Sequence, residues 1–218
     1  MMKTKHIAIR HHLHAEDGRS LVETIAVCMI AALLLAFTVP QVINARRLMR
    51  SVALPREVAA QLRFARQQAM SQRQAFTFQY NDVDKKIRII DHQASGPAVL
   101  SAAGYPNTTG SVIVLEVPLA YDKSPVPIAD FKYGVPSGIT NSNLSDGTSM
   151  TALSSNTVNV TFQPDGSVVD ANGNAVNRSL YFYNNRVQKE TAAAVSVLGT
   201  AGRVKVWRYN RSANQYQE

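Results

Sequence analysis

Residues 21–39 read LVETIAVCMIAALLLAFTV, nineteen residues that carry a single charge, on Glu23. As a helix rising about 1.5 Å per residue, this run would span roughly 28 Å, close to the hydrocarbon thickness of a bilayer. It is longer than the apolar core of an ordinary secretory signal, and no clear small-x-small cleavage site follows it. The run therefore predicts one membrane-crossing helix near the N-terminus, in which Cys28 is expected to be a small buried apolar side chain.

Glu23 is the one residue in this run that needs a separate explanation. A carboxylate in a membrane helix costs about 2.5–3.5 kcal/mol at the helix centre and less near an end. One interpretation places Glu23 at the headgroup level, where the positive end of the helix dipole favours it. In the other interpretation, Glu23 meets a cationic partner inside an assembly, and the pairing offsets the cost of removing the carboxylate from water.

The residues around Glu23 carry a family motif. The segment 18–24, GRSLVET, followed at once by the apolar run, resembles the prepilin cleavage and methylation motif of type IV pilins and type II secretion pseudopilins. The resemblance implies that an aspartyl prepilin peptidase cuts after Gly18 and that the new N-terminal residue, Arg19, is N-methylated. It also implies that Glu23 pairs with the N-terminal amine of a neighbouring subunit. Arg19 departs from the family pattern, which usually has phenylalanine there.

A helical pattern continues beyond the apolar run. Pro40 matches a family proline and removes one helix hydrogen bond, and Pro55 is expected to add a second kink. Apolar side chains then recur every three or four residues as one helix face: Leu54, Val58, Leu62, Ala65 and Ala69. Four arginines fall off this apolar stripe: Arg56, Arg63, Arg66 and Arg73. We expect the stripe to pack on a sheet. The string LRFARQQAMSQRQ, residues 62–74, resembles the helix end of the GspH/FimT subgroup.

At Ala75 the apolar period changes from helical to two, which indicates strands. Residues 76–80 and 87–90 are expected to form a hairpin around a turn at 81–85. Further strands are expected at 112–117, 158–163, 179–183, 194–198 and 203–209, with a short return at 167–169 after Pro164-Asp165-Gly166. Residues 93–110 and 122–156 are rich in Gly, Pro, Ser, Thr and Asn and are expected to be long loops. The strings TFQPDGS (161–167) and GRVKV (202–206) resemble the same subgroup.

Together these elements predict an α+β class, and the resemblance implies a pilin-like fold: a long N-terminal helix packed on an antiparallel β-sheet head. The expected organisation is a cleaved leader (1–18), a transmembrane and filament-core helix with a basic collar (19–50), and a periplasmic head (51–218). The resemblance implies a single-pass protein of the bacterial inner membrane, which enters a pilus or pseudopilus on assembly. Charge does not orient the helix, because the leader 1–18 carries three cations and three more follow the apolar run: Lys3, Lys5 and Arg10 in the leader, Arg46, Arg47 and Arg50 after the run.

The net charge of +8 is unevenly distributed. Residues 19–74 have eight arginines and two acidic residues, a net charge of +6, whereas residues 1–18 and 75–218 carry +1 each. Without its last sixteen residues the head, 75–202, carries −2. The high pI, near 9.8, therefore belongs mainly to the helix, where it suits anionic headgroups and contacts between subunits.

The chain offers few residues for catalysis or metal binding. One cysteine excludes an internal disulfide and a multi-cysteine metal site. Four of the five histidines lie within the first fourteen residues, so only His92 remains for the rest of the chain, and we expect it at the surface. Asp82-Val83-Asp84 offers too few oxygens for a calcium loop. We therefore expect no catalytic residues, no metal, no cofactor and no enzymatic activity.

The favoured function is that of a minor pilin or pseudopilin in a type IV pilus or a type II secretion pseudopilus. Its expected partners are the prepilin peptidase, other pilin or pseudopilin subunits and the membrane. The sequence does not choose between the two machines.

The alternative is a DNA-binding minor pilin of the FimT type, acting in DNA uptake. Those proteins use a C-terminal Gly-Arg-x-Arg motif, and residues 202–205 match it with lysine in the last place. The candidate DNA contacts are Arg203, Lys205, Arg208 and Arg211, with Trp207 and Tyr209 offering faces for stacking. The simpler interpretation is an edge strand whose cations discourage pairing with another strand.

Overall fold

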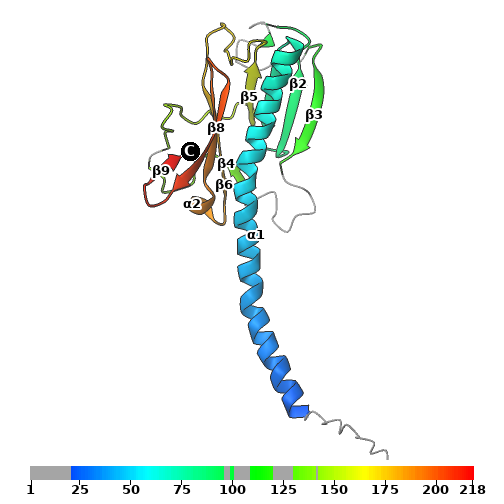
Figure 1. Cartoon of the computed structure of the whole chain (residues 1–218), viewed down its shortest axis with the longest axis vertical. Coiled ribbons are helices and arrows are strands. Elements are labelled where there is room, and N and C mark those ends of the chain that lie inside the picture. The colour runs from blue at the N-terminus through cyan, green and yellow to red at the C-terminus, as the bar shows by residue number, and fades with distance from the viewer. Residues whose placement is uncertain (1–20, 96–98, 101–108, 120–129, 141) are drawn as a thin grey trace, which may run out of the picture. The chain divides into compact units, whose positions relative to one another are not determined.

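We analysed a computed structural model of the chain, which describes residues 21–95, 99–100, 109–119, 130–140 and 142–218 (Figure 1). The elements in chain order are α1 (Leu21–Gln72), β1 (Phe76–Asn81), β2 (Lys86–Asp91), β3 (Val112–Pro118), β4 (Phe131–Tyr133), β5 (Thr157–Phe162), β6 (Arg178–Asn184), α2 (Gln188–Thr191), β7 (Ala193–Leu198), β8 (Arg203–Asn210) and β9 (Gln215–Gln217). The chain divides into two compact units, residues 1–42 and 43–218. The α+β fold class that the sequence predicts is therefore confirmed.

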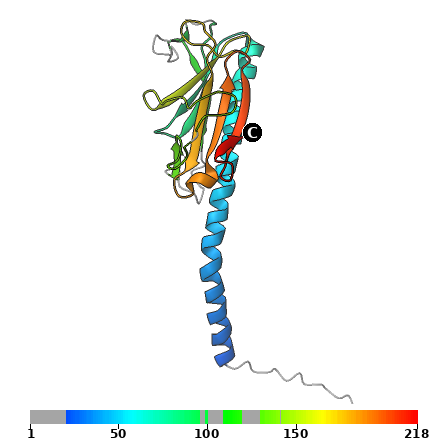
Figure 2. The same ribbon diagram turned by 90° about the vertical axis from the view of Figure 1, so that its left-hand side faces the viewer.

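The second unit contains two antiparallel sheets. One has the strand order β3-β2-β1-β5, and the other has the order β4-β6-β7-β8-β9. In the first sheet Phe78 lies opposite Ile89 on β2 and Val160 on β5, so β1 is an inner strand with its apolar side chains in register. The C-terminal part of α1 lies along these sheets (Figure 2).

The main core forms between α1 and the two sheets. All five residues of the predicted apolar stripe are buried there: Leu54, Val58, Leu62, Ala65 and Ala69. They pack with residues from both sheets, including Phe78, Val160, Leu180 and Val195. The helical period in the sequence therefore identified the buried face of α1. The helix is continuous through both Pro40 and Pro55.

Most predicted strands are present, with ends shifted by a residue or two. The return at 167–169 is the exception, because it forms only single bridges, between Phe162 and Val168 and between Val169 and Ala175. The sequence does not predict β4, α2 or β9, each only three or four residues long. β4 lies inside 122–156, which we expected to be a loop throughout, so that expectation is wrong for residues 131–133.

The expectation that His92 lies at the surface is also wrong. His92 follows the last residue of β2 and is only 6% exposed. Its Nε2 atom lies 2.7 Å from the Thr77 hydroxyl, which in turn lies 2.7 Å from the Thr161 hydroxyl. Neighbouring strands thus supply polar partners that allow the imidazole to be buried.

A second cluster covers the face of the β4-β6-β7-β8-β9 sheet that points away from the main core. It contains Tyr181, Trp207 and Tyr216, and Leu144 packs on it from the segment after β4. Polar contacts hold that segment down: Tyr181 donates to the Ser142 carbonyl at 2.6 Å. The indole N–H of Trp207 donates to Ser196 Oγ at 2.8 Å, and Ser196 donates to Asp146 at 2.6 Å.

Replacing Asp146 by alanine is expected to lower the free energy of unfolding by about 1–2 kcal/mol at pH 7, since it removes hydrogen bonds from Ser196 and Thr148. Partial burial raises the pKa of the Asp146 carboxyl, but the hydrogen bonds from Ser196 and Thr148 outweigh this effect and leave its pKa below the ordinary value. A carboxyl with a lowered pKa stabilises the fold above its unfolded pKa and loses this effect as the pH falls through its folded pKa. The difference between wild type and variant should therefore shrink below about pH 4.

Urea unfolding of the detergent-solubilised chain at pH 7 and pH 2.5, followed by the fluorescence of the single tryptophan, measures this difference. Asp84→Ala, in the exposed β1–β2 turn, is the control and should change stability by less than about 0.5 kcal/mol. A deficit for Asp146→Ala that stays the same at both pH values would contradict the assignment.

Candidate functional site

The first part of α1 is an exposed apolar helix. Residues Leu21–Arg46 have a mean hydropathy of 2.4, and among the described helices this segment alone is long and apolar enough to cross a membrane. Its large side chains are open to the surroundings; Leu34 is 64% exposed and Phe37 is 70% exposed. An apolar surface of this length is stable only in a membrane or against other apolar helices.

Glu23 lies in the first turn of α1 as the structure describes it. None of the described residues pairs with its carboxylate, while the helix dipole favours a negative charge at this end. Gly18 and Arg19, the predicted cleavage and methylation positions, lie outside the described residues. Pro40 lies within α1, and nearby the Thr38 hydroxyl donates to the Leu34 carbonyl at 2.8 Å. That bond gives the Thr38 hydroxyl a hydrogen-bond acceptor within an otherwise apolar part of the helix.

The four C-terminal cations do not form one cluster. Because side chains alternate along a strand, Arg203 and Lys205 lie on the face of β8 that carries Trp207, and Arg208 lies on the opposite face. Arg211 lies in the turn after β8.

Two of these cations have carboxylate partners. Lys205 Nζ lies 2.6 Å from Glu218, and Arg211 lies 3.0 Å from Glu190. Arg203 and Arg208 are exposed, and no described carboxylate forms an ion pair with either. The pair of Arg211 with Glu190 is exposed, and exposed ion pairs contribute only about 0–1 kcal/mol, so this pair could be exchanged for another anion at small cost.

Trp207 does not offer a face for stacking, and this part of the DNA-binding hypothesis is wrong. Its side chain is only 2% exposed, in the second cluster. The tyrosine two residues later, Tyr209, is partly buried, and its ring packs on Tyr216 with a centroid distance of 5.4 Å. The sequence could not show this burial, because the covering residues come from β9 and from the segment after β4.

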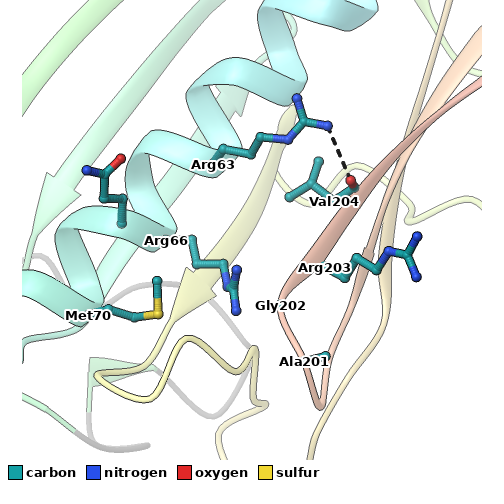
Figure 3. Close-up of a pocket in the computed structure, with 8 residues that line it drawn as sticks. Arg63, Arg66, Met70, Ala201, Gly202, Arg203 and Val204 are labelled. Carbon is teal, nitrogen blue, oxygen red and sulfur yellow. Dashed lines mark hydrogen bonds between the residues drawn. The ribbon is translucent and has the colours of Figure 1, made fainter.

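The edge-strand interpretation holds for only part of β8. Strand β9 pairs with Arg208, Tyr209 and Asn210. Among the described strands, none pairs with residues 203–207 on the side away from β7. There Arg63 of α1 reaches the strand instead, and its Nη2 atom donates to the Val204 carbonyl at 3.4 Å (Figure 3).

The three strings that resemble the GspH/FimT subgroup meet around Arg66. Arg66 Nε donates to the Gly166 carbonyl, in the turn after β5, at 3.4 Å. The turn before β8 approaches the same point at Gly202, where a Cβ atom would overlap the Gly166 carbonyl oxygen and lie 2.7 Å from Arg66 Nε. Sequence reasoning missed this junction. The only available signal was that Arg63 and Arg66 fall on the same side of the apolar stripe.

No group of three or more histidine, cysteine, aspartate or glutamate side chains in the described part of the chain could hold a metal ion.

No protein-family model matches the sequence, and no curated protein matches it either. Two crystal structures of the type IV minor pilin FimU from Pseudomonas aeruginosa (strain PAO1) are similar to this chain. Each has 16% sequence identity to it and a TM-score of 0.41, and the match covers 76% of this chain. It covers 91% of one FimU chain and 96% of the other.

Proposed function

We propose that this chain is a minor subunit of a type IV pilus or of a type II secretion pseudopilus. The observation that carries the proposal is the exposed apolar segment Leu21–Arg46 in the same chain as a compact α+β unit. Glu23, in the first turn of this segment, pairs with none of the described residues. A membrane satisfies the apolar side chains of such a segment, but it leaves the carboxylate without a partner. A filament core supplies apolar neighbours and a cation together.

The proposed mechanism begins with cleavage after Gly18, which makes the amine of Arg19 the new N-terminus. That amine is a positive charge only four residues before Glu23. In a bundle of such helices, the amine of one subunit lies within reach of Glu23 in its neighbour, so that two costly charges neutralise each other. The apolar side chains of Leu21–Arg46 exchange lipid contacts for contacts with other helices during the same step. The work of this subunit is mechanical and adhesive.

The proposed location follows from the same segment. Before assembly the chain is anchored in the bacterial inner membrane by one helix, with residues 51–218 in the periplasm. After assembly the helix lies in the filament core. The basic residues that follow the apolar run then lie near anionic headgroups or between subunits.

Fractionation of cells that make the filament tests this proposal. The processed chain should be found in the sheared filament fraction as well as in the inner membrane. A chain that remains entirely in the membrane while other subunits are sheared off would contradict a role as a filament subunit.

DNA binding by the C-terminal cations is the second candidate function. The exposed guanidinium groups of Arg203 and Arg208 favour it. The ion pair of the largely buried Lys205, the burial of Trp207 and the placement of Arg208 on the opposite face weigh against it. If the tail binds DNA, Arg203→Ala with Lys205→Ala should abolish the retardation of a duplex in a low-salt gel.

A further inference from the structure

A groove lies between α1 and the start of β8, and we name it the arginine groove. It has a volume of about 540 Å³ and is lined by Arg63, Arg66, Gln67, Met70, Ala201, Gly202, Arg203 and Val204. Two of its three arginines, Arg63 and Arg66, extend from α1 toward β8, whereas the Arg203 side chain points away from α1 (Figure 3). The groove therefore presents two guanidinium groups from successive turns of one helix. The Cβ atoms of residues with this i, i+3 spacing are about 5–6 Å apart.

Each guanidinium group makes one long hydrogen bond to a backbone carbonyl and still has donors to spare. Arg63 donates to the Val204 carbonyl and Arg66 donates to the Gly166 carbonyl, each at 3.4 Å. A guanidinium has five N–H donors, so each of these groups can make further hydrogen bonds. Within the described part of the chain no carboxylate pairs with either arginine, and none is among the residues that line the groove. Two neighbouring cations that pair with no described carboxylate form a site for an anion.

The walls of the groove indicate which anion fits. Met70, Ala201 and Val204 provide apolar surface beside the two guanidinium groups. A glutamate or aspartate side chain matches this combination, because its methylene groups can contact the wall while its carboxylate accepts two parallel bonds from an arginine. A single-stranded nucleic acid would use aromatic faces for its bases, and none of the described residues that line the groove is aromatic.

We propose that the arginine groove binds an acidic segment on the head of a neighbouring filament subunit. This inference rests on the proposed function for the identity of the partner, whereas the preference for carboxylates rests on the groove itself. It uses two arginines of α1 that belong neither to the apolar core nor to the C-terminal cations. It would fix the orientation of one head against the next, while Glu23 and the apolar segment hold the helices.

Fluorescence anisotropy with a labelled hexaglutamate peptide tests the groove directly. The probe is added to the full-length chain in a non-ionic detergent at 50 mM NaCl, and saturable binding is expected. Arg63→Gln with Arg66→Gln should weaken binding at least tenfold. The control, Arg56→Gln with Arg73→Gln, removes the same charge outside the groove, from α1 and from the residue that follows it, and should weaken binding less than threefold. Equal losses in the two double variants would overturn the proposal, because they would show general attraction to a basic helix.

Two further measurements cover folding and the nature of the anion. The fluorescence of buried Trp207 reports whether each variant is folded. If the glutamine variant is not folded, the variant Arg63→Lys with Arg66→Lys replaces it. The lysine variant keeps both positive charges but loses the planar guanidinium fork, so it should still weaken binding at least threefold. Unchanged binding in the folded lysine variant would overturn the proposal. Tighter binding of a twelve-nucleotide single strand than of hexaglutamate, through the same arginines, would also overturn it in favour of a nucleic-acid site.

The partner is tested separately in cells that make the filament. If the glutamine variant is processed and folded but is lost from sheared filaments, the partner assignment is supported. If wild-type chain is present in filaments yet does not bind hexaglutamate, the groove proposal is overturned while the proposed function stands. If hexaglutamate binds but the chain never enters filaments, the proposed function and this partner are overturned together.

Discussion

Replacing Glu23 by alanine is expected to leave the chain in the inner membrane and to reduce its amount in sheared filaments at least tenfold. The apolar segment would still insert, because removing a carboxylate makes insertion easier. In the filament, however, the amine of a neighbouring N-terminus would lose its counter-charge. Removing one partner of a buried ion pair costs about 3–5 kcal/mol, because the other charge remains buried and uncompensated.

Two further substitutions separate charge from shape at this position. Glu23→Gln keeps the size of the side chain and removes its charge, so it should be lost from filaments as fully as Glu23→Ala. Thr24→Ala changes the adjacent residue and should assemble normally. Quantitative immunoblots of membrane and sheared fractions measure both. Normal assembly of Glu23→Gln would show that the carboxylate does not neutralise a neighbour.

Gly202→Ala is expected to destabilise the second unit by about 3 kcal/mol or more, an effect of the size of overpacking in a core. Gly202 has a φ of +57°, and a Cβ atom there would overlap the backbone carbonyl of Gly166. Backbone cannot rotate away as a flexible side chain can. The turns before β8 and after β5 must therefore separate, which would also break the contact of Arg66 with Gly166.

Gly147→Ala is the matched control for this substitution. Gly147 has a positive φ of +78° as well, but among the described residues other than Gly147 and its two chain neighbours, no atom lies within 4 Å of the position of a new Cβ. It should cost only the left-handed backbone penalty, about 1–2 kcal/mol. Urea unfolding of the full-length chain in detergent, followed by Trp207 fluorescence, compares the two variants. Equal losses would mean that close approach of the two turns contributes nothing to stability.

Periodic features of the chain could be predicted from its sequence. The apolar stripe from Leu54 to Ala69 is visible because a buried helix face repeats every three to four residues. The β1–β2 hairpin is visible because Phe76, Phe78 and Tyr80 repeat every two. Both patterns are local, so a single segment contains the whole signal.

Features that depend on partners from distant segments could not be predicted. His92 can be buried because the Thr77 hydroxyl, on a neighbouring strand, lies within hydrogen-bond distance of its imidazole. Trp207 is buried because its indole N–H bonds to Ser196 and residues after β4 pack on the cluster that contains it. The arginine groove joins residues about 140 positions apart, Arg63 and Val204. Strand β9 is three residues long and shows no period of its own, so only its pairing with β8 defines it.

The mass of the mature N-terminus tests the central claim most directly. The full-length chain is co-expressed with a prepilin peptidase, purified from membranes and analysed by intact-mass and N-terminal peptide spectrometry. We predict the loss of residues 1–18, a new N-terminus at Arg19, and no cleavage in Gly18→Ala. A chain that keeps residues 1–18, or one that is cut after the apolar run near Val39, would contradict the assignment to a pilus or pseudopilus.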